Sequence, residues 1–304
     1  MKNKKLIFLD IDGTLTEPGK NIPPDSALEA VGKAREAGHR VFLCSGRNYG
    51  SVKPLLAYGF DGAICSAGGY ILCGDTVLYD CPLDEEMKNR TLRLLVESGM
   101  NLILECFQDS YADSGFKEAM LRKQVIRMDK GSADEQHTEE GSKEPDGLKI
   151  DLTNNSELLR WREQAEKNFR ILPLEQYDGR PVYKFVILAF GREKFLKTKE
   201  LLEPWFHFRI EENPPGVIDG ELINRKFDKG QAVLRICEYL GVPPEDTIGF
   251  GDSPNDLELL AVAGTGVCME NGVEFLKQKA DMICPAVTSD GIYKAFEQLG
   301  LFDR

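Results

Sequence analysis

The sequence KLIFLDIDGT, residues 5–14, runs from an apolar segment into two carboxylates, Asp10 and Asp12. Strands bury apolar side chains and become polar where they leave a sheet, so a buried strand is expected to end at these two acids. Gly13 follows, and glycine adopts turn conformations that other residues avoid. Taken alone, Asp12-Gly13 is also compatible with an ordinary hairpin turn. The pattern indicates a reaction centre at the edge of a sheet.

The pattern of strands and helices predicts an α/β fold: a Rossmann-like parallel-sheet core with an inserted α+β cap domain. We expect the core at residues 1–82 and 225–304 and the cap at residues 83–224. The expected core strands are 5–10, 40–44, 61–65, 247–250, 266–269 and 281–284, and the expected core helices are 24–38, 49–58, 230–240, 257–263 and 273–280.

The insert begins after Cys81-Pro82, where the character of the sequence changes. Its stretch 129–146 has few apolar residues and is predicted to be an exposed loop without function. The helices and strands expected around that loop are, in order, 84–98, 101–107, 148–153, 156–168, 181–190, 193–204 and 206–212.

Composition narrows the possible functions. The chain has 304 residues, 42% of them hydrophobic, and a net charge of −12, and it shows no basic stripe that would bind nucleic acid. Its eight cysteines form no C-x-x-C pair, and its three histidines lack metal-ligand spacing. We therefore expect reduced thiols, and neither a zinc site nor a Ser-His-Asp triad. No signal peptide and no membrane span are recognisable, which predicts a cytoplasmic protein.

Ser45 ends a second apolar strand, in the segment Leu43–Arg47, LCSGR. A hydroxyl, the backbone N–H groups around Gly46 and the Arg47 guanidinium could together bind phosphate oxygens. The alternative is a helix-capping Ser with a solvated Arg. Lys229 stands at the start of a helix, where the helix dipole disfavours a cation unless it faces an anion. The alternative for Lys229 is an ordinary surface position.

The segment 251–256, GDSPND, follows another buried strand. Ser253, Pro254 and Asp256 fit the start of a helix with a capping box, which gives Asp256 a structural explanation. For Asp252 a structural explanation is weaker, because it precedes the cap. Asn255 is expected either to bind an anion or to face solvent.

The combination decides between these alternatives. Asp10, Ser45 and Asp252 each follow a predicted parallel strand, and the carboxyl ends of such strands share one edge of the sheet, where ligands bind. Several carboxylates gathered there require a counter-ion, and hard oxygen donors without Cys or His indicate Mg²⁺. Lys229 would add positive charge beside a phosphate.

With these motifs the chain resembles the haloacid dehalogenase-like (HAD) phosphatases, and more narrowly their Cof-type branch, whose large cap lies between the second and third motifs. The resemblance covers essentially the whole chain. It rests on Asp10–Thr14, Ser45, Lys229 and 251–256, and on the ending 266–272, followed by Ala280-Asp281 and Asp290-Gly291. The chain departs from the family's pattern at two places, and both bear on the choice of substrate. Ala67-Gly68-Gly69 stands where relatives often have Asn-Gly-Ala, and the cap stretch 129–146 is unusually polar.

The resemblance implies a role for each residue. Asp10 would be the nucleophile that forms an aspartyl-phosphate, and also a Mg²⁺ ligand. Asp12 would be the general acid and base, with its backbone carbonyl on the metal. Ser45, Lys229 and Asn255 would hold the phosphate. Asp252 would bind Mg²⁺, and Asp256 would support Asp252 or bind the ion with it.

The sequence thus predicts a Mg²⁺-dependent phosphatase acting on a small phosphorylated metabolite, such as a sugar phosphate, without nucleic-acid or membrane partners. Two alternatives stay open at this point. One is a phosphomutase or phosphotransferase with the same intermediate, although only residues 15–40 separate the first two motifs, too few for a cap there. The other is a phospho-accepting signalling module, which would lack both the second acid and a large cap.

Overall fold

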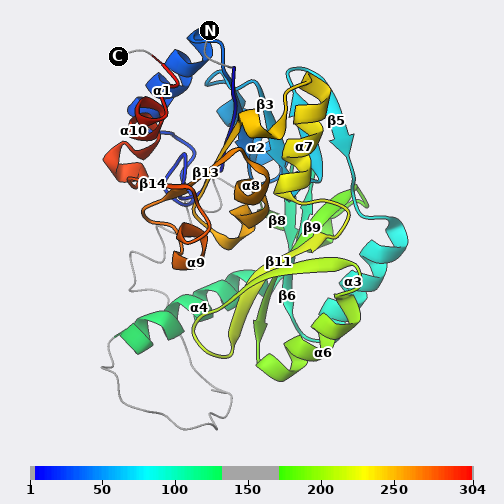
Figure 1. The fold of residues 1–304 in the computed structure, drawn as a ribbon. Helices are drawn as coiled ribbons and strands as arrows, with labels where there is room; N and C mark the ends of the chain where they lie inside the picture. Colours follow the sequence, from blue (N-terminus) through cyan, green and yellow to red (C-terminus); the bar gives the residue numbers. More distant parts are fainter. Residues whose placement is uncertain (1–3, 132–170, 303–304) are drawn as a thin grey trace. The chain divides into compact units, whose positions relative to one another are not determined.

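The computed structural model describes residues 4–131 and 171–302. The chain forms two compact units, one of Met1–Pro82 with Arg225–Arg304 and the other of Leu83–Asn224 (Figure 1). The expected elements 148–153 and 156–168 lie outside the described residues.

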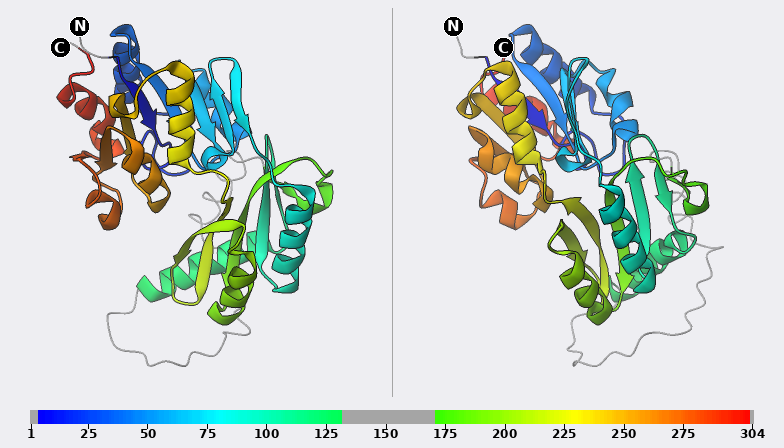
Figure 2. Two further views of the ribbon diagram at one scale, coloured as in Figure 1. Left: turned by 45° about the vertical axis from the view of Figure 1, so that its right-hand side comes forward. Right: turned by 90° about the vertical axis from the view of Figure 1, so that its right-hand side faces the viewer.

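The first unit is built on an eight-stranded sheet with helices on both faces (Figure 2). The strand order is β14-β13-β12-β1-β2-β3-β4-β5, and pairing is parallel from β14 to β3. The predicted parallel core sheet is therefore confirmed. Its strands are β1 Leu6–Leu9, β2 Arg40–Cys44, β3 Gly62–Cys65, β4 Tyr70–Cys73, β5 Thr76–Asp80, β12 Thr247–Gly251, β13 Thr265–Met269 and β14 Met282–Cys284.

The antiparallel hairpin of β4 and β5 was not among the expected elements. Gly74 turns between its strands with φ of +57°, a conformation that glycine adopts easily. The helices of this unit are α1 Asp25–Glu36, α2 Tyr49–Leu56, α7 Lys229–Leu240, α8 Leu257–Val262, α9 Glu274–Lys277 and α10 Gly291–Gln298, of which only α10 was not expected.

Helices α7, α8 and α9 cover one face of this sheet because their apolar side chains pack against Leu6, Phe8 and Phe42. The rings of Phe8 and Phe42 stack with their centroids 5.3 Å apart. On the opposite face, Phe296 of α10 packs against Phe250 of β12. Every residue of β1, and every residue of β2 except Arg40, is buried, so both faces of these central strands are covered, which explains their apolar sequences.

The second unit is a six-stranded sheet in the order β10-β11-β9-β6-β7-β8, antiparallel except between β7 and β8. Its elements are α3 Glu85–Glu97, β6 Asn101–Cys106, β7 Ser110–Ala112, α4 Phe116–Gly131, β8 Ile171–Pro173, β9 Val182–Phe190, α6 Arg192–Leu202, β10 Phe206–Glu212 and β11 Val217–Asn224. Residues 129–131 of the stretch predicted as a loop belong to α4, so the prediction is wrong there; 132–146 lie outside the described residues.

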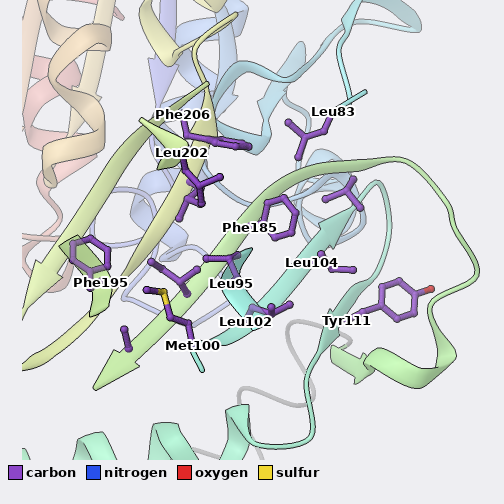
Figure 3. Packing of buried hydrophobic residues seen from close by; sticks show 14 of the residues in the cluster. Leu83, Leu95, Met100, Leu102, Leu104, Tyr111, Phe185, Phe195, Leu202 and Phe206 are labelled. Carbon is purple, nitrogen blue, oxygen red and sulfur yellow. The ribbon is translucent and has the colours of Figure 1, made fainter. Parts of the chain in front are cut away.

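The two faces of this second sheet are packed differently. Helices α3 and α6 bury a large cluster on one face, which includes Leu95, Phe185 and Phe195 (Figure 3). The opposite face packs Ile103 and Leu188 against α4 in a smaller cluster. Strand β9 contributes side chains to both clusters because alternate side chains of a strand point to opposite faces of the sheet.

Candidate active site

The ends of neighbouring strands bring the predicted acids together. Strand β1 pairs with both β12 and β2, with Leu9 opposite Phe250 and Leu43, so Asp10 lies beside the segments that carry Asp252 and Ser45. The backbone N–H of Asp10 donates to the carbonyl of Phe250 at 3.0 Å. Oxygens of Asp10, Asp252 and Asp256 lie within 4.8 Å of one another. The predicted convergence at one edge of the sheet is present.

Lys229 lies at the centre of this cluster. Its Nζ donates to Oδ1 of Asp10 at 2.7 Å, to Oδ1 of Asp256 at 2.6 Å and to Oδ1 of Asn255 at 3.1 Å. The side chain of Lys229 is 1% exposed, so the surface alternative is wrong. Lys229 is the first residue of α7, and the side chain of Asp228 just before it caps the helix by accepting the N–H of Gln231.

Three carboxylates and one lysine leave this buried cluster short of positive charge. Burial raises the pKa of Asp10 well above its usual range, and the charge of Asp256 adds to it against the opposing effect of Lys229. Burial and Asp256 likewise raise the pKa of Asp252 to about 7. Burial would lower the pKa of Lys229, but Asp10 and Asp256 outweigh it and raise that pKa. One further cation fits this arrangement, and carboxylate oxygens suit a hard divalent ion.

Both oxygens of Asp256 are engaged. Oδ1 accepts from Lys229, and Oδ2 accepts the backbone N–H groups of Asp252 and Ser253, each at 3.1 Å. The capping box inferred from the sequence is present. Asp256 therefore holds Lys229 and the loop of Asp252 in place, and its direct ligation of a metal stays a prediction.

Asn255 lies beside Lys229 with its amide oriented by two contacts. Its Oδ1 accepts from Lys229 Nζ and, at 2.8 Å, from the hydroxyl of Ser253. The Nδ2 group donates to no acceptor among the described residues and can donate to another group. This arrangement favours the anion-binding alternative for Asn255.

Asp12 is paired with Arg47. The guanidinium makes a two-pronged contact, with Nε 2.7 Å from Oδ2 and Nη2 2.6 Å from Oδ1, and Oδ1 also accepts the N–H of Gly19 at 3.0 Å. Burial tends to raise the pKa of Asp12, but the hydrogen bonds and charge of Arg47 outweigh it and lower that pKa. Arg47 is buried rather than solvated, and it also donates to Asn21 at 2.5 Å.

Ser45 is buried at the end of β2 and does not cap the following helix. The residue that caps α2 is Asn48, whose side chain accepts the N–H of Ser51. The Ser45 hydroxyl accepts the N–H of Arg47 at 3.1 Å, and Gly46 between them is partly exposed. The helix-cap alternative for Ser45 is thus wrong, and its hydroxyl lies in the loop between β2 and α2.

A family model described as haloacid dehalogenase-like hydrolase matches residues 7–296. The chain belongs to this family. It is 26% identical over 303 residues to the 5-amino-6-(5-phospho-D-ribitylamino)uracil phosphatase YwtE of Bacillus subtilis, covering 97% of this chain and 98% of YwtE. It is 26% identical over 294 residues to the pyridoxal phosphate phosphatase YbhA of Escherichia coli, covering 95% and 96%.

A solved structure confirms the fold of this hydrolase. The HAD subclass IIB sugar phosphatase BT4131 superposes with a TM-score of 0.68 at 21% identity, over 98% of this chain and 100% of that one. With the family model and the named relatives, these findings make the chain a HAD-like, Cof-type phosphatase, a phosphoric monoester hydrolase. Within the described part of the chain, no helix has the length and apolar character that a membrane crossing requires.

Three residues that the sequence analysis did not assign hold parts of the site. Thr14 donates its hydroxyl to Asp252 at 3.3 Å, Asn271 donates its amide to the carbonyl of Gly13 at 2.8 Å, and Asn21 binds Arg47. Asn271 lies two residues beyond the end of β13. Asp252 was selected because it follows a parallel strand, and the same reasoning would have selected Asn271. Asn21 has no comparable signal, since it lies between β1 and α1.

Replacing Gly13 by Ala should disable this hydrolase. Gly13 has φ of +82°, and a Cβ there would lie 2.2 Å from Oδ2 of Asp252. We expect kcat to fall about 10²-fold or more, because small displacements of reacting groups are costly. The matched control is Gly74→Ala, with φ of +57° and nothing within 4 Å of its Cβ. It should cost about 1 kcal/mol of stability and leave kcat unchanged. Equal kcat values for the two variants would refute the contact with Asp252.

Proposed function

We propose that this phosphatase hydrolyses a small phosphorylated metabolite through a phosphorylated Asp10. The single observation that carries the proposal is the buried contact of Asp10 with Lys229 beside Asp252, at the carboxyl edge of a parallel sheet. A carboxylate in this position can attack phosphorus, and the lysine offsets the negative charge of the phosphoryl group.

In the first proposed step, an oxygen of Asp10 forms a bond to phosphorus while the bond from phosphorus to the ester oxygen breaks. Asp12 gives a proton to the departing alkoxide. In the second step, Asp12 takes a proton from water, the water oxygen bonds to phosphorus, and the bond to Asp10 breaks, releasing inorganic phosphate. Because Arg47 lowers the pKa of Asp12, Asp12 must leave Arg47 and take up a proton from solvent before it can donate one to the alkoxide.

We assign phosphate binding to Ser45, Gly46, Arg47, Lys229 and Asn255. The buried hydroxyl of Ser45, the buried charge of Lys229 and the oriented amide of Asn255 support the assignment. The guanidinium of Arg47 already binds Asp12. Arg47 can therefore bind the phosphate only if a phosphate oxygen replaces Asp12 at one of these two contacts.

The residues that would hold Mg²⁺ are Asp10, Asp252 and the backbone carbonyl of Asp12, with Asp256 behind them. When bound, the ion would offset negative charge on the phosphate and on the nucleophile. The fit rests on the crowding of these carboxylates and on the raised pKa values of Asp10 and Asp252, which indicate a shortage of positive charge.

We propose the unit Leu83–Asn224 as the cap that selects the substrate, and the cytoplasm as the location of the protein. The cap lies between Ser45 and Lys229 in the chain, where Cof-type relatives carry theirs. The names of YwtE, YbhA and BT4131 refer to phosphorylated small molecules, and a sugar or polyol phosphate is our first choice here.

The proposal is tested by measuring phosphate released from an aryl phosphate and from a panel of phosphorylated metabolites. We expect turnover with Mg²⁺, loss of more than 90% of it after chelation with EDTA, and recovery when Mg²⁺ is restored in excess. Phosphate that passes to a second sugar instead of water would indicate a phosphotransferase. A stable phospho-protein without phosphate release would indicate a signalling module. Activity unaffected by EDTA would contradict the metal assignment.

A further inference from the structure

The loop after β13 contacts two of the segments that carry proposed Mg²⁺ ligands. The side-chain amide of Asn271 donates to the carbonyl of Gly13 at 2.8 Å, and the backbone N–H of Val273 donates to the carbonyl of Asp252 at 2.9 Å. Gly272 lies between these two donors, and a Cβ there would come within 3.0 Å of the same Asp252 carbonyl. This short loop thus joins the segment after β1 to the segment after β12.

Gly13 and Thr14 lie directly against the carboxylate of Asp252. A Cβ on Gly13 would be 2.2 Å from Oδ2 of Asp252, and the hydroxyl of Thr14 donates to its Oδ1 at 3.3 Å. The N–H of Gly13 donates to the carbonyl of Thr16 at 2.8 Å, and this N–H shares one planar peptide with the carbonyl of Asp12. The position of Gly13 therefore governs the spacing between two proposed ligands, the Asp12 carbonyl and the Asp252 carboxylate.

Asn271 restrains a part of the backbone that would otherwise rotate easily. Gly13 has φ of +82°, and a glycine has more freedom in both of its backbone angles than any other residue. Among the described residues, the amide of Asn271 is the only donor to the Gly13 carbonyl. Asn271 itself is exposed, so water can replace this hydrogen bond at little cost to the stability of the fold. Positioning of the site explains the contact better than stability does.

Rigid placement of ligands matters more for Mg²⁺ than for Ca²⁺. Mg²⁺ requires nearly ideal octahedral geometry with bonds of about 2.0–2.1 Å, whereas Ca²⁺ accepts about six to eight oxygens at about 2.3–2.6 Å in flexible arrangements. Removing a group that orients metal ligands typically lowers metal affinity by about 10- to 100-fold. A contact that fixes Gly13 beside Asp252 should therefore favour the smaller ion.

We propose that Asn271 is a positioning residue that gives the metal site its preference for Mg²⁺ over Ca²⁺. This inference rests on the proposed function and adds a residue that keeps two of the ligands at the spacing that the smaller ion needs. Asn271 acts through the carbonyl of Gly13 and not as a ligand of the ion.

The test measures metal binding in the absence of substrate. The dissociation constants for Mg²⁺ and for Ca²⁺ follow from the rise of Tm with the concentration of each ion. In Asn271→Ala we expect the constant for Mg²⁺ to rise about tenfold and the constant for Ca²⁺ by about threefold at most. Tm in metal-free buffer should stay within about 2 °C of the native value. The matched control is Asn89→Ala, an exposed asparagine of α3, which should change neither constant.

A second variant, Asn271→Asp, keeps the shape of the side chain and removes the donor. Its added charge attracts both divalent ions alike, so the informative quantity is the ratio of the Ca²⁺ constant to the Mg²⁺ constant. We expect this ratio to fall by about threefold or more, as in Asn271→Ala. Turnover that Asn271→Ala loses at low Mg²⁺ should return when the Mg²⁺ concentration is raised about tenfold.

Equal weakening of Mg²⁺ and Ca²⁺ binding would assign Asn271 a general structural role and overturn the inference. An unchanged ratio of the two constants in both variants would overturn it as well, and the metal site of the proposed function would stand. If the native protein bound neither ion, the metal assignment and the inference would both fall.

Discussion

Asp10→Asn should lower kcat on p-nitrophenyl phosphate by about 10⁴-fold or more, because the amide cannot form the acyl-phosphate bond. The protein should nevertheless stay folded. Burial and the neighbouring acids raise the pKa of Asp10, which means that its charge is unfavourable in this setting. A neutral side chain of the same shape relieves that repulsion, and Asp256 remains as a partner for Lys229. We therefore expect an unchanged or higher Tm in metal-free buffer.

The control for this prediction is Asp75→Asn, an exposed residue in the turn between β4 and β5. It undergoes the same chemical change and should retain native kcat and Tm. The assignment of Asp10 would be refuted by an Asp10→Asn protein that still turned over the aryl ester at a tenth of the native rate. A variant that lost activity only because it unfolded would be recognised by its lowered Tm.

Lys229→Met should damage both catalysis and stability. Removing the cation leaves the buried Asp10 and Asp256 and the half-buried Asp252 without a counter-charge, and breaking a buried ion pair from one side costs about 3–5 kcal/mol. We expect a loss of that size in chemical denaturation without metal, and a fall in kcat of about 10²-fold or more, since a charge beside the phosphoryl group is lost.

Two comparison variants make this result specific. Lys53→Met changes an exposed lysine of α2 and should be neutral in both measurements. Adding Asp256→Asn to Lys229→Met should restore part of the stability, because one uncompensated carboxylate is removed, and should not restore kcat. If the double variant were less stable than Lys229→Met alone, repulsion among the carboxylates would not be the cause.

Most of the core was predictable from the sequence. Residues 6–9 and 41–44 are continuous apolar runs because both faces of their strands are covered, and such runs followed by Asp10 and Ser45 mark the edge where the site lies. The hairpin of β4 and β5 was overlooked although Gly74-Asp75 between two β-rich segments is a hairpin signal. Helix α4 was overlooked because it leads into a polar stretch that suggested a loop.

Other features lie beyond a one-dimensional pattern. Nothing near Lys229 in the chain shows that its Nζ lies among three acids rather than in water. Arg47 was singled out from the sequence for phosphate binding, but its partner Asp12 lies 35 positions away and was assigned a different task. The buried position of Lys184 between Glu105 and Glu221 was not noticed, because these residues are scattered over three strands among ordinary charged residues.

The sequence by itself determined which strands are buried, where they end and which acids stand at those ends, because these properties depend on short-range periodicity and on the sharing of one edge by parallel strands. The tertiary structure alone decided which charges neutralise one another. Pairing energies depend on distances of a few ångströms and on exclusion of water, and both arise only when residues such as Asp10 and Lys229, 219 positions apart, are packed together.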